Sequence, residues 1–288
     1  MTSKNPDYDF KWCPGCGDFG VRRAIEFALA ARNEKFETRM QDHVIVAGIG
    51  CSGNLVHLME SVEQPYGIHG IHGRSLPIAM GVKSANPKLN VITVAGDGDF
   101  LSIGMEHISP QANRNLDITA IVMDNGVYGL TKGQSSPTTA LGVVTSSTPF
   151  GKIEGQFHPL AYYLEIGVSF IASHYSSKPR DLANLIERAM EHRGFSIVHV
   201  MSPCTTYNDT YEELKGNKRK GIEPGIFQVP EEHDPTDKAQ AVELLKDPRV
   251  PLGVIYREER PTLDQAYGKI AAKANSVTAQ KILATYAI

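Results

Sequence analysis

The chain has 288 residues, of which 41% are hydrophobic and 21% charged, and its formal net charge is −3. This composition is typical of a globular protein with one large domain or two modest ones. A charge so close to neutral gives no electrostatic reason to expect a nucleic-acid or membrane partner. The first residues, MTSKNPDYDFKW, lack the apolar stretch of a secretory signal. The longest apolar runs are strand-sized, so we expect a cytoplasmic protein.

The predicted elements alternate between helices and buried strands along the chain. A helix is expected over residues 19–32, where apolar residues recur at helical spacing and Asp18 is placed to act as the N-cap. A second helix is expected over 179–193. Four apolar, β-branched runs predict strands at 43–49, 91–96, 118–123 and 195–201. This alternation predicts an α/β fold with an open, mostly parallel sheet covered by helices on both faces.

The chain changes character after about residue 205, where charged and turn-forming residues replace the apolar runs. We therefore expect residues 1–204 to form the ligand-binding domain and residues 205–288 to form a C-terminal extension that covers the core or contacts a partner. A basic run lies between Lys215 and Lys220. It either docks an acidic protein or forms a solvated loop.

Four cysteines occur as one CxxC pair, Cys13 and Cys16, and two distant single residues, Cys51 and Cys204. Disulfide bonds are not expected in a cytoplasmic chain. The pattern fits one metal or iron–sulfur site with four thiolate ligands. It fits equally well a redox-active CxxC pair with two buried, inert thiols, and the spacing does not choose between these alternatives.

Four chemically distinctive residues, Cys51, Asp97, Asn125 and Cys204, each follow the end of a predicted strand. In open α/β sheets, ligands bind at the carboxyl ends of the strands. We therefore expect these four side chains to gather at one edge of the sheet and to form a single compound site.

The segment Gly96-Asp97-Gly98, followed by Asn125, predicts a site for Mg²⁺ and a diphosphate. Magnesium prefers oxygen ligands, which Asp97, Asn125 and the backbone carbonyl of Val127 can provide. Glycines on either side of Asp97 allow backbone N–H groups to approach phosphate oxygens. The alternative is a tight turn in which Asp97 merely caps a helix.

This arrangement resembles the diphosphate-binding motif of thiamine diphosphate enzymes, in which Asp97, Asn125 and the main-chain oxygen of Val127 would bind Mg²⁺. Five further motifs narrow the resemblance: WCPGCG at 12–17, GIGCS at 48–52, HGR at 72–74, YGLTKGQ at 128–134 and SPC at 202–204. Together the motifs resemble the β subunit of 2-oxoacid:ferredoxin oxidoreductases over roughly residues 10–210. Within that family the resemblance is greatest to the 2-oxoglutarate enzymes.

The resemblance implies a [4Fe–4S] cluster and a set of cofactor contacts. The cluster would be held by Cys13, Cys16, Cys51 and Cys204, although a structural zinc ion with the same ligands is an alternative. The residues implied to contact thiamine diphosphate are Ile49, Gly50, Cys51, Ser52, His72, Gly98, Asp99, Gly129 and Leu130. Among these, the Leu130 side chain is placed to bend the cofactor.

Three residues are candidates for a direct part in catalysis. The resemblance implies that His72 hydrogen-bonds near the diphosphate or the substrate, whereas the residue type alone favours a histidine satisfied within a turn. Arg74 is either a substrate ligand or a salt-bridge partner. Lys132 follows the predicted Mg²⁺ loop and offers a compact positive charge to a 2-oxoacid carboxylate, unless it is a solvated loop lysine.

The implied activity is oxidative decarboxylation of a 2-oxoacid, dependent on coenzyme A, with electrons passed through the cluster to ferredoxin. Our preferred substrate is 2-oxoglutarate, giving succinyl-CoA and CO₂, and the reaction is expected to be reversible. No candidate matches the glutamate that activates thiamine diphosphate, and the family places it on an α subunit. We therefore expect activity only in an α/β complex, with (αβ)₂ stoichiometry.

The sequence leaves three alternatives to this function open. The first is pyruvate or another 2-oxoacid as substrate. The second is a non-oxidative thiamine diphosphate decarboxylase or carboligase, which would have no need of four cysteines at strand ends. The third is a non-catalytic module stabilised by zinc.

Overall fold

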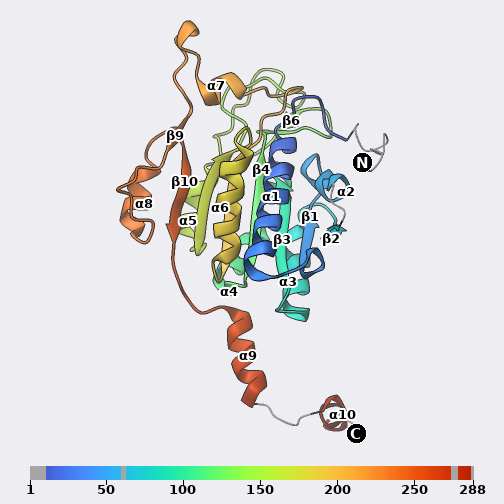
Figure 1. Ribbon diagram of the computed structural model, residues 1–288. Helices are drawn as coiled ribbons and strands as arrows, with labels where there is room; N and C mark the ends of the chain where they lie inside the picture. Colours follow the sequence, from blue (N-terminus) through green and yellow to red (C-terminus); the bar gives the residue numbers. More distant parts are fainter. Residues whose placement is uncertain (1–10, 60–62, 274–277, 287–288) are drawn as a thin grey trace.

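The computed structural model describes residues 11–59, 63–273 and 278–286. Its centre is an eight-stranded sheet with the order β2-β1-β3-β4-β8-β7-β10-β9 (Figure 1). In that order the strands span Tyr66–His69, His43–Ala47, Asn90–Gly96, Ile118–Asp124, Phe195–Met201, Phe170–Tyr175, Val250–Arg257 and Ile226–Gln228. A separate two-stranded ribbon pairs β5 (Val127–Tyr128) with β6 (Gln134–Ser135).

The sheet is parallel except where β10 runs antiparallel to β7. The central strand β4 is buried at every position, as expected for a parallel strand covered on both faces. This confirms the predicted open, mostly parallel α/β sheet. The first predicted strand ends two residues early, at Ala47, because the chain turns at Gly50, where φ is 122°.

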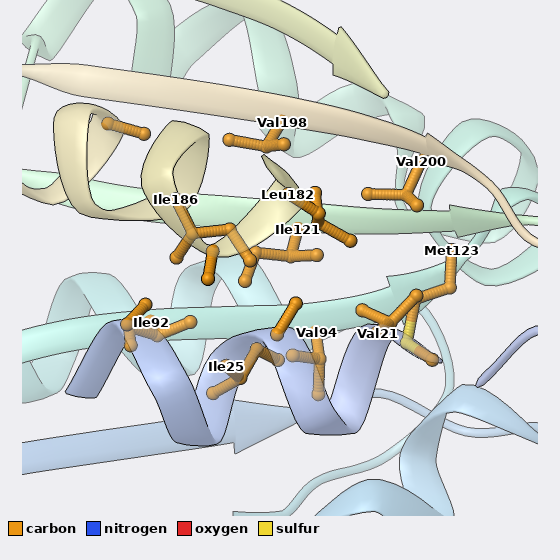
Figure 2. Close-up of a cluster of buried hydrophobic side chains, with 14 of the residues drawn as sticks. Val21, Ile25, Ile92, Val94, Ile121, Met123, Leu182, Ile186, Val198 and Val200 are labelled. Carbon is orange, nitrogen blue, oxygen red and sulfur yellow. The ribbon is translucent and has the colours of Figure 1, made fainter. Parts of the chain in front are cut away.

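One face of the sheet is covered by α1 (Asp18–Phe36) and α6 (Pro179–Glu191), which lie side by side (Figure 1). Figure 2 shows how Val21 and Ile25 of α1 and Leu182 and Ile186 of α6 pack against strand residues such as Ile121. Fully burying an aliphatic side chain of this size stabilises the fold by about 1.5–3 kcal/mol. This layer therefore fixes both helices, and the N-terminus of α1 lies beside the cysteine-rich loop that precedes it.

The opposite face is covered mainly by three helices: α3 (Ser75–Ala85), α4 (Ile108–Arg114) and α5 (Pro159–Glu165). Their buried residues, among them Leu76, Ile108 and Tyr163, form a second apolar cluster with the sheet. The short helix α2 (Leu55–Leu58) follows β1. The sheet is thus enclosed between two layers of helices, and its carboxyl edge is left free for a ligand.

The segment after residue 205 contains α7 (Tyr211–Lys215), α8 (Lys238–Leu244), α9 (Leu263–Lys273) and α10 (Ala279–Ala284), in addition to β9 and β10. Because β10 pairs with β7, part of the predicted extension completes the central sheet. The expected helical end, 263–285, consists of two helices, and α9 points away from the body (Figure 1). No helix in the part of the chain described here is long and apolar enough to cross a bilayer.

Candidate functional site

The strand ends meet as the sequence predicted. β1, β3, β4 and β8 are consecutive neighbours in the sheet and run parallel. Cys51, Asp97, Asn125 and Cys204 follow their carboxyl ends and therefore lie along one edge. Two cavities open there. Cys51 and Asn125 line both of them.

The first cavity has a volume of about 80 Å³ and opens to solvent. All nine residues predicted to contact the cofactor and all three predicted to bind Mg²⁺ line its wall: Ile49, Gly50, Cys51, Ser52, His72, Asp97, Gly98, Asp99, Asn125, Val127, Gly129 and Leu130. Tyr128 and Thr131, for which the sequence predicted no contact of their own, complete much of the remaining wall.

Asp97 is held at the floor of this cavity. Its side chain is buried, one carboxylate oxygen accepts a hydrogen bond from the backbone N–H of Asn125 at 3.3 Å, and the other accepts one from the Thr138 hydroxyl at 2.8 Å. The Asn125 side-chain oxygen accepts a hydrogen bond from Val127 N–H at 3.0 Å. The carboxylate of Asp97 and the amide oxygen of Asn125 are hard oxygen donors of the kind that Mg²⁺ requires.

A buried polar chain extends behind Asp97. The Thr138 hydroxyl also lies 2.8 Å from a carboxylate oxygen of Asp124, whose other oxygen lies 2.9 Å from Nε2 of His199. Burial, followed by the nearby charge of Asp124, raises the pKa of Asp97 to about 7. Asp97 and Asp124 thus place two carboxyl groups around one buried hydroxyl. A divalent cation bound there would stabilise their negative charge.

The Ser52 hydroxyl supports the presence of a ligand in this cavity. It is almost fully buried, and its oxygen has no hydrogen-bond partner among the described residues. A side chain added at Gly96 would approach it to 3.4 Å, so the hydroxyl lies over the glycine turn. A buried hydroxyl without a partner is costly, and a phosphate oxygen would satisfy it.

Gly98 makes room for the Tyr128 ring, a role that the sequence did not predict for this glycine. A Cβ at this position would lie 2.4 Å from the Tyr128 ring, and the Tyr128 hydroxyl donates to the Gly98 carbonyl at 3.2 Å. Glycine is therefore needed here first to make room for Tyr128. This contact ties the turn that follows β3 to the ribbon that follows β4.

The His72 ring contacts the Asp99 carboxylate on the cavity wall. The same carboxylate oxygen, Oδ1, also accepts hydrogen bonds from the N–H groups of Gly73 at 2.8 Å and Ile49 at 3.3 Å. Asp99 thus joins three loops through Oδ1, whereas its Oδ2 atom is buried and has no hydrogen-bond partner among the described residues. The Oδ1 atom would therefore act on the cofactor largely through the loops that it holds.

Arg74 lies outside the group of residues that line the first cavity. Its guanidinium lies 3.1 Å from the Glu106 carboxylate and donates to the carbonyls of Gly73 and Ile103. The structure therefore gives Arg74 the salt bridge that the sequence had left open as an alternative. Lys132 lines the second cavity and has a left-handed backbone, with φ at 84°. Lys132 is exposed at the protein surface, in a turn in which its own N–H donates to the Gly129 carbonyl.

The second cavity collects all four cysteines as free thiols: Cys13, Cys16, Cys51 and Cys204. The Sγ atoms of Cys51 and Cys204 both lie within 4 Å of the position that a Cβ on Gly129 would take. Burial raises the pKa of the Cys51 thiol to about 12 and that of Cys16 above its usual range, and the neighbouring Asp18 adds to both effects. Such thiols are unreactive nucleophiles, and a metal would have to displace their protons.

Within the described ranges, no group of three or more His, Cys, Asp or Glu side chains is arranged to hold a single metal ion. The cysteines nevertheless line one cavity of about 190 Å³. In a cluster of four irons each thiolate binds a different iron atom, so the sulfur atoms lie farther apart than around a single ion. A set of four thiolates is compatible with an iron–sulfur cluster and with zinc.

The loop that carries Cys13 and Cys16 is fastened to the segment after β8. Gly17 N–H donates to the Pro203 carbonyl, the Thr205 hydroxyl to the Pro14 carbonyl, and the Tyr211 hydroxyl to the Gly15 carbonyl, at 2.9–3.0 Å. The predicted N-cap role of Asp18 is wrong. Asp18 is the first residue of α1, and its carboxylate accepts a hydrogen bond from the Ser202 hydroxyl instead of capping the helix.

Comparisons with known proteins agree with this geometry. Residues 48–200 match the C-terminal TPP binding domain of thiamine pyrophosphate enzymes, and residues 204–272 match the C-terminal part of the pyruvate ferredoxin oxidoreductase beta subunit. The chain is 38% identical to a 2-oxoacid:ferredoxin oxidoreductase subunit beta of Saccharolobus solfataricus, covering 86% of this chain and 82% of that protein. It is 36% identical to a 2-oxoglutarate synthase subunit KorB of Archaeoglobus fulgidus, covering 78% and 82%.

A solved structure is similar over almost the whole length. It is a 2-oxoglutarate:ferredoxin oxidoreductase from Magnetococcus marinus with 2-oxoglutarate, coenzyme A and succinyl-CoA bound. The TM-score is 0.84 at 35% sequence identity, and the match covers 96% of this chain and 92% of that one.

Proposed function

The chain belongs to the β subunits of 2-oxoacid:ferredoxin oxidoreductases, and we propose that it joins an α subunit to oxidise 2-oxoglutarate to succinyl-CoA and CO₂. Electrons would leave through a [4Fe–4S] cluster to ferredoxin, and the reaction would also run in reverse. The observation that carries the proposal is the position of Cys51, whose side chain borders both the cofactor cavity and the cysteine cavity.

Thiamine diphosphate, when bound, supplies an electron sink for loss of CO₂ from the 2-oxoacid. Asp97, Asn125 and the Val127 carbonyl would hold Mg²⁺ on its diphosphate. Thr138 orients Asp97 for this purpose, and the buried Ser52 hydroxyl is available to a phosphate oxygen. Leu130, whose side chain is half exposed at the cavity mouth, would press the cofactor into its bent form.

His72 would act at the same cavity, whose wall it lines. Its imidazole is partly exposed, while the Asp99 carboxylate that it contacts is buried. Contact with a buried carboxylate fixes the orientation of the ring. His72 could then donate a hydrogen bond to the substrate or diphosphate from the ring nitrogen that does not face Asp99.

The four cysteines would hold the cluster, which supplies one-electron transfer when bound. Cys51 and Gly129 line both cavities, so only a short stretch of protein separates the two cofactors. The Trp12 indole donates to the Cys51 carbonyl at 2.7 Å and fixes the turn that carries this ligand.

The choice of 2-oxoglutarate rests on the similar proteins. Several similar proteins are named 2-oxoglutarate synthase or oxidoreductase subunits, and the similar solved structure contains 2-oxoglutarate and succinyl-CoA. Lys132 is close in sequence to Leu130 at the cavity mouth and would pair with a substrate carboxylate. Pyruvate or another 2-oxoacid is the second candidate.

The α subunit would cover a group of exposed apolar side chains between residues 141 and 153. We call the segment 141–153 the apolar loop. Its side chains at Phe150 and Ile153 are 99% and 89% exposed, and Leu141 and Val144 are about two-thirds exposed. The loop is ordered internally by hydrogen bonds between Gly142, Val143 and Lys152. Large apolar groups on a rigid loop are typical of protein interfaces, and an (αβ)₂ assembly would bury them.

Ferredoxin would dock near the basic run. Lys218, Arg219 and Lys220 form an exposed turn after α7, and Tyr211 of α7 contacts the Cys13–Cys16 loop. The positive charge of this turn would accelerate encounter with an acidic carrier. Reversal of Lys218 and Arg219 to glutamate should slow ferredoxin reduction at low salt. An unchanged rate would place ferredoxin elsewhere.

The test of the proposed function is anaerobic purification of the αβ complex, followed by an iron assay, a visible spectrum and activity on a panel of 2-oxoacids with coenzyme A. We expect about four iron atoms for each β subunit, absorption at about 400 nm and a preference for 2-oxoglutarate. Cys204→Ser should lose iron and colour, while Ser202→Ala should keep both. A colourless, iron-free wild-type complex would refute the cluster.

A further inference from the structure

Lys152 is a buried lysine whose side-chain hydrogen bonds are all made to one short loop. Its side chain is 3% exposed. The Nζ atom donates to the carbonyl oxygens of Ser136, Pro137 and Thr139, each at 3.0 Å. An ammonium group has three donors, so all of them are used. A charge is buried at tolerable cost only when it is fully hydrogen-bonded in this way.

The loop held by Lys152 spans residues 136–139 and faces the proposed Mg²⁺ ligands. Thr138 contacts the carboxylates of Asp97 and Asp124 through its hydroxyl. The Thr139 hydroxyl donates to the Gly126 carbonyl and accepts from Ser136 N–H at 2.7 Å. The loop therefore fixes one Mg²⁺ ligand, Asp97, and the peptide between the other two, Asn125 and Val127.

We propose that Lys152 is a positioning residue for the Mg²⁺–diphosphate site, and that it acts by holding loop 136–139 against Asp97 and Gly126. The proposal rests on the proposed function. Without the ammonium, three carbonyl groups that converge on one buried point would have no common donor. The loop would rearrange to satisfy them, and the Thr138 hydroxyl would leave the Asp97 carboxylate.

Lys83 provides a matched control within the same fold. Its side chain is also 3% exposed, and its Nζ atom donates to the Leu89 carbonyl at 2.9 Å and to the Asp117 carboxylate at 3.2 Å. It lines neither the cofactor cavity nor the cysteine cavity. Removal of this ammonium should destabilise the fold without affecting the proposed cofactor site.

The experiment compares wild type, Lys152→Met and Lys83→Met in the assembled αβ complex after removal of Mg²⁺ and thiamine diphosphate. Mn²⁺ binding is measured by electron paramagnetic resonance, thiamine diphosphate binding by calorimetry, and unfolding by thermal melting. We expect Lys152→Met to weaken Mn²⁺ and thiamine diphosphate binding about 10- to 100-fold, the scale on which loss of outer-sphere support weakens metal sites. Lys83→Met should lower the melting temperature and leave both affinities unchanged.

Thr138→Val removes the hydroxyl through which loop 136–139 contacts Asp97, and it does so without removing a buried charge. It should weaken Mn²⁺ binding to a similar extent, and adding Lys152→Met to it should weaken binding little further, because both changes release the same carboxylate. If Lys152→Met does not fold, Lys152→Gln takes its place with the same expected results. Equal affinities in wild type and the Lys152 variant, or an equal loss in Lys83→Met, would overturn the proposal. A wild-type complex that binds no thiamine diphosphate would instead refute the proposed function.

Discussion

His72 and Asp99 are in contact through their side chains, and the carboxylate is buried while the imidazole is about one-third exposed. The same carboxylate receives N–H groups from the loops after β1 and before α3. One buried side chain thereby sets the position of a histidine and of two backbone turns around the cofactor cavity. A substitution of Asp99 should therefore lower the activity through its effect on His72 and on these two turns.

Replacing Asp99 with asparagine keeps the shape of the side chain and removes its charge. His72 would lose its contact with a carboxylate, so we expect kcat/KM for the 2-oxoacid to fall about 10- to 100-fold, which is ~1.4–2.7 kcal/mol of transition-state stabilisation. Steady-state kinetics and the pH profile of kcat/KM provide the measurement. Glu106→Gln, which removes the partner of Arg74, is the control and should have little effect. Equal behaviour of the two variants would rule out a role for the His72–Asp99 pair.

Lys132→Ala tests the proposed contact with the substrate carboxylate. Loss of one charge-assisted contact should raise KM for 2-oxoglutarate about tenfold or more, since such bonds contribute roughly 1.5–3 kcal/mol. Thermal stability should hardly change, because the side chain is exposed. Lys218→Ala, an exposed lysine on a separate turn, should leave KM unaltered. An unchanged KM in Lys132→Ala would make Lys132 a solvated loop residue.

The apolar loop should contribute to assembly with the α subunit. Replacing both Phe150 and Ile153 with serine removes large apolar groups that are exposed in this chain alone. Interface anchors of this kind each contribute about 2 kcal/mol or more, so the double variant should raise the dissociation constant of the complex by about 100-fold or more. Sedimentation or light scattering would measure it. Val242→Ser on α8 is the control, and an equally tight complex in the double variant would move the interface elsewhere.

His43 should make the fold sensitive to acid. It is fully buried at the start of β1, and its Nε2 atom lies 2.7 Å from the Asn33 side-chain oxygen. Burial, followed by the positive charge of Arg32, lowers the pKa of His43 to about 4. The folded state therefore disfavours the charged form of His43. The contribution of neutral His43 to the free energy of unfolding is complete above the unfolded pKa of about 6.5 and is lost as the pH falls toward 4.

The loss would amount to ~3 kcal/mol of unfolding free energy for this shift. Urea denaturation between pH 7 and pH 4 would follow it. His43→Gln should show a shallower decline over this interval, although it should be less stable than wild type at pH 7. A variant with the same pH dependence as wild type would show that other groups cause the acid sensitivity.

Much of the sheet could be predicted because parallel strands buried on both faces need continuous apolar runs. The segment at 118–123 is such a run, and it forms the fully buried β4. The strand at 170–175 was missed because it contains the polar residues Ser173 and His174. Both are buried: the Ser173 hydroxyl donates to the Pro251 carbonyl of β10, and the His174 ring contacts the Tyr175 carbonyl. The strand at 250–257 was missed because Pro251 and Gly253 interrupt its apolar run. In the structure β10 contains both residues, and its pairing with β7 shifts register between Val254 and Tyr256.

The meeting of Cys51, Asp97, Asn125 and Cys204 at one edge was predictable because each follows a strand end, where the topology alone brings them together. Thr138 and Lys152 were not predictable, since they lie in irregular loops with no periodicity, and their partners become neighbours only in the folded chain. Asp18 was misassigned for the same reason. Its hydrogen-bond partner, Ser202, lies 184 residues away in the sequence, and no local sequence pattern predicts this contact.

The fastening of the Cys13–Cys16 loop to the segment after β8 has a consequence for biosynthesis. Thr205 and Pro14 are 191 residues apart in the sequence, yet they are hydrogen-bonded. At a translation rate of roughly 5–20 residues per second, the early loop waits about ten to forty seconds before its anchoring segment has been made. During that interval two thiols remain without their final neighbours, so the nascent chain passes through a period in which it is vulnerable to oxidation and dependent on a reducing environment.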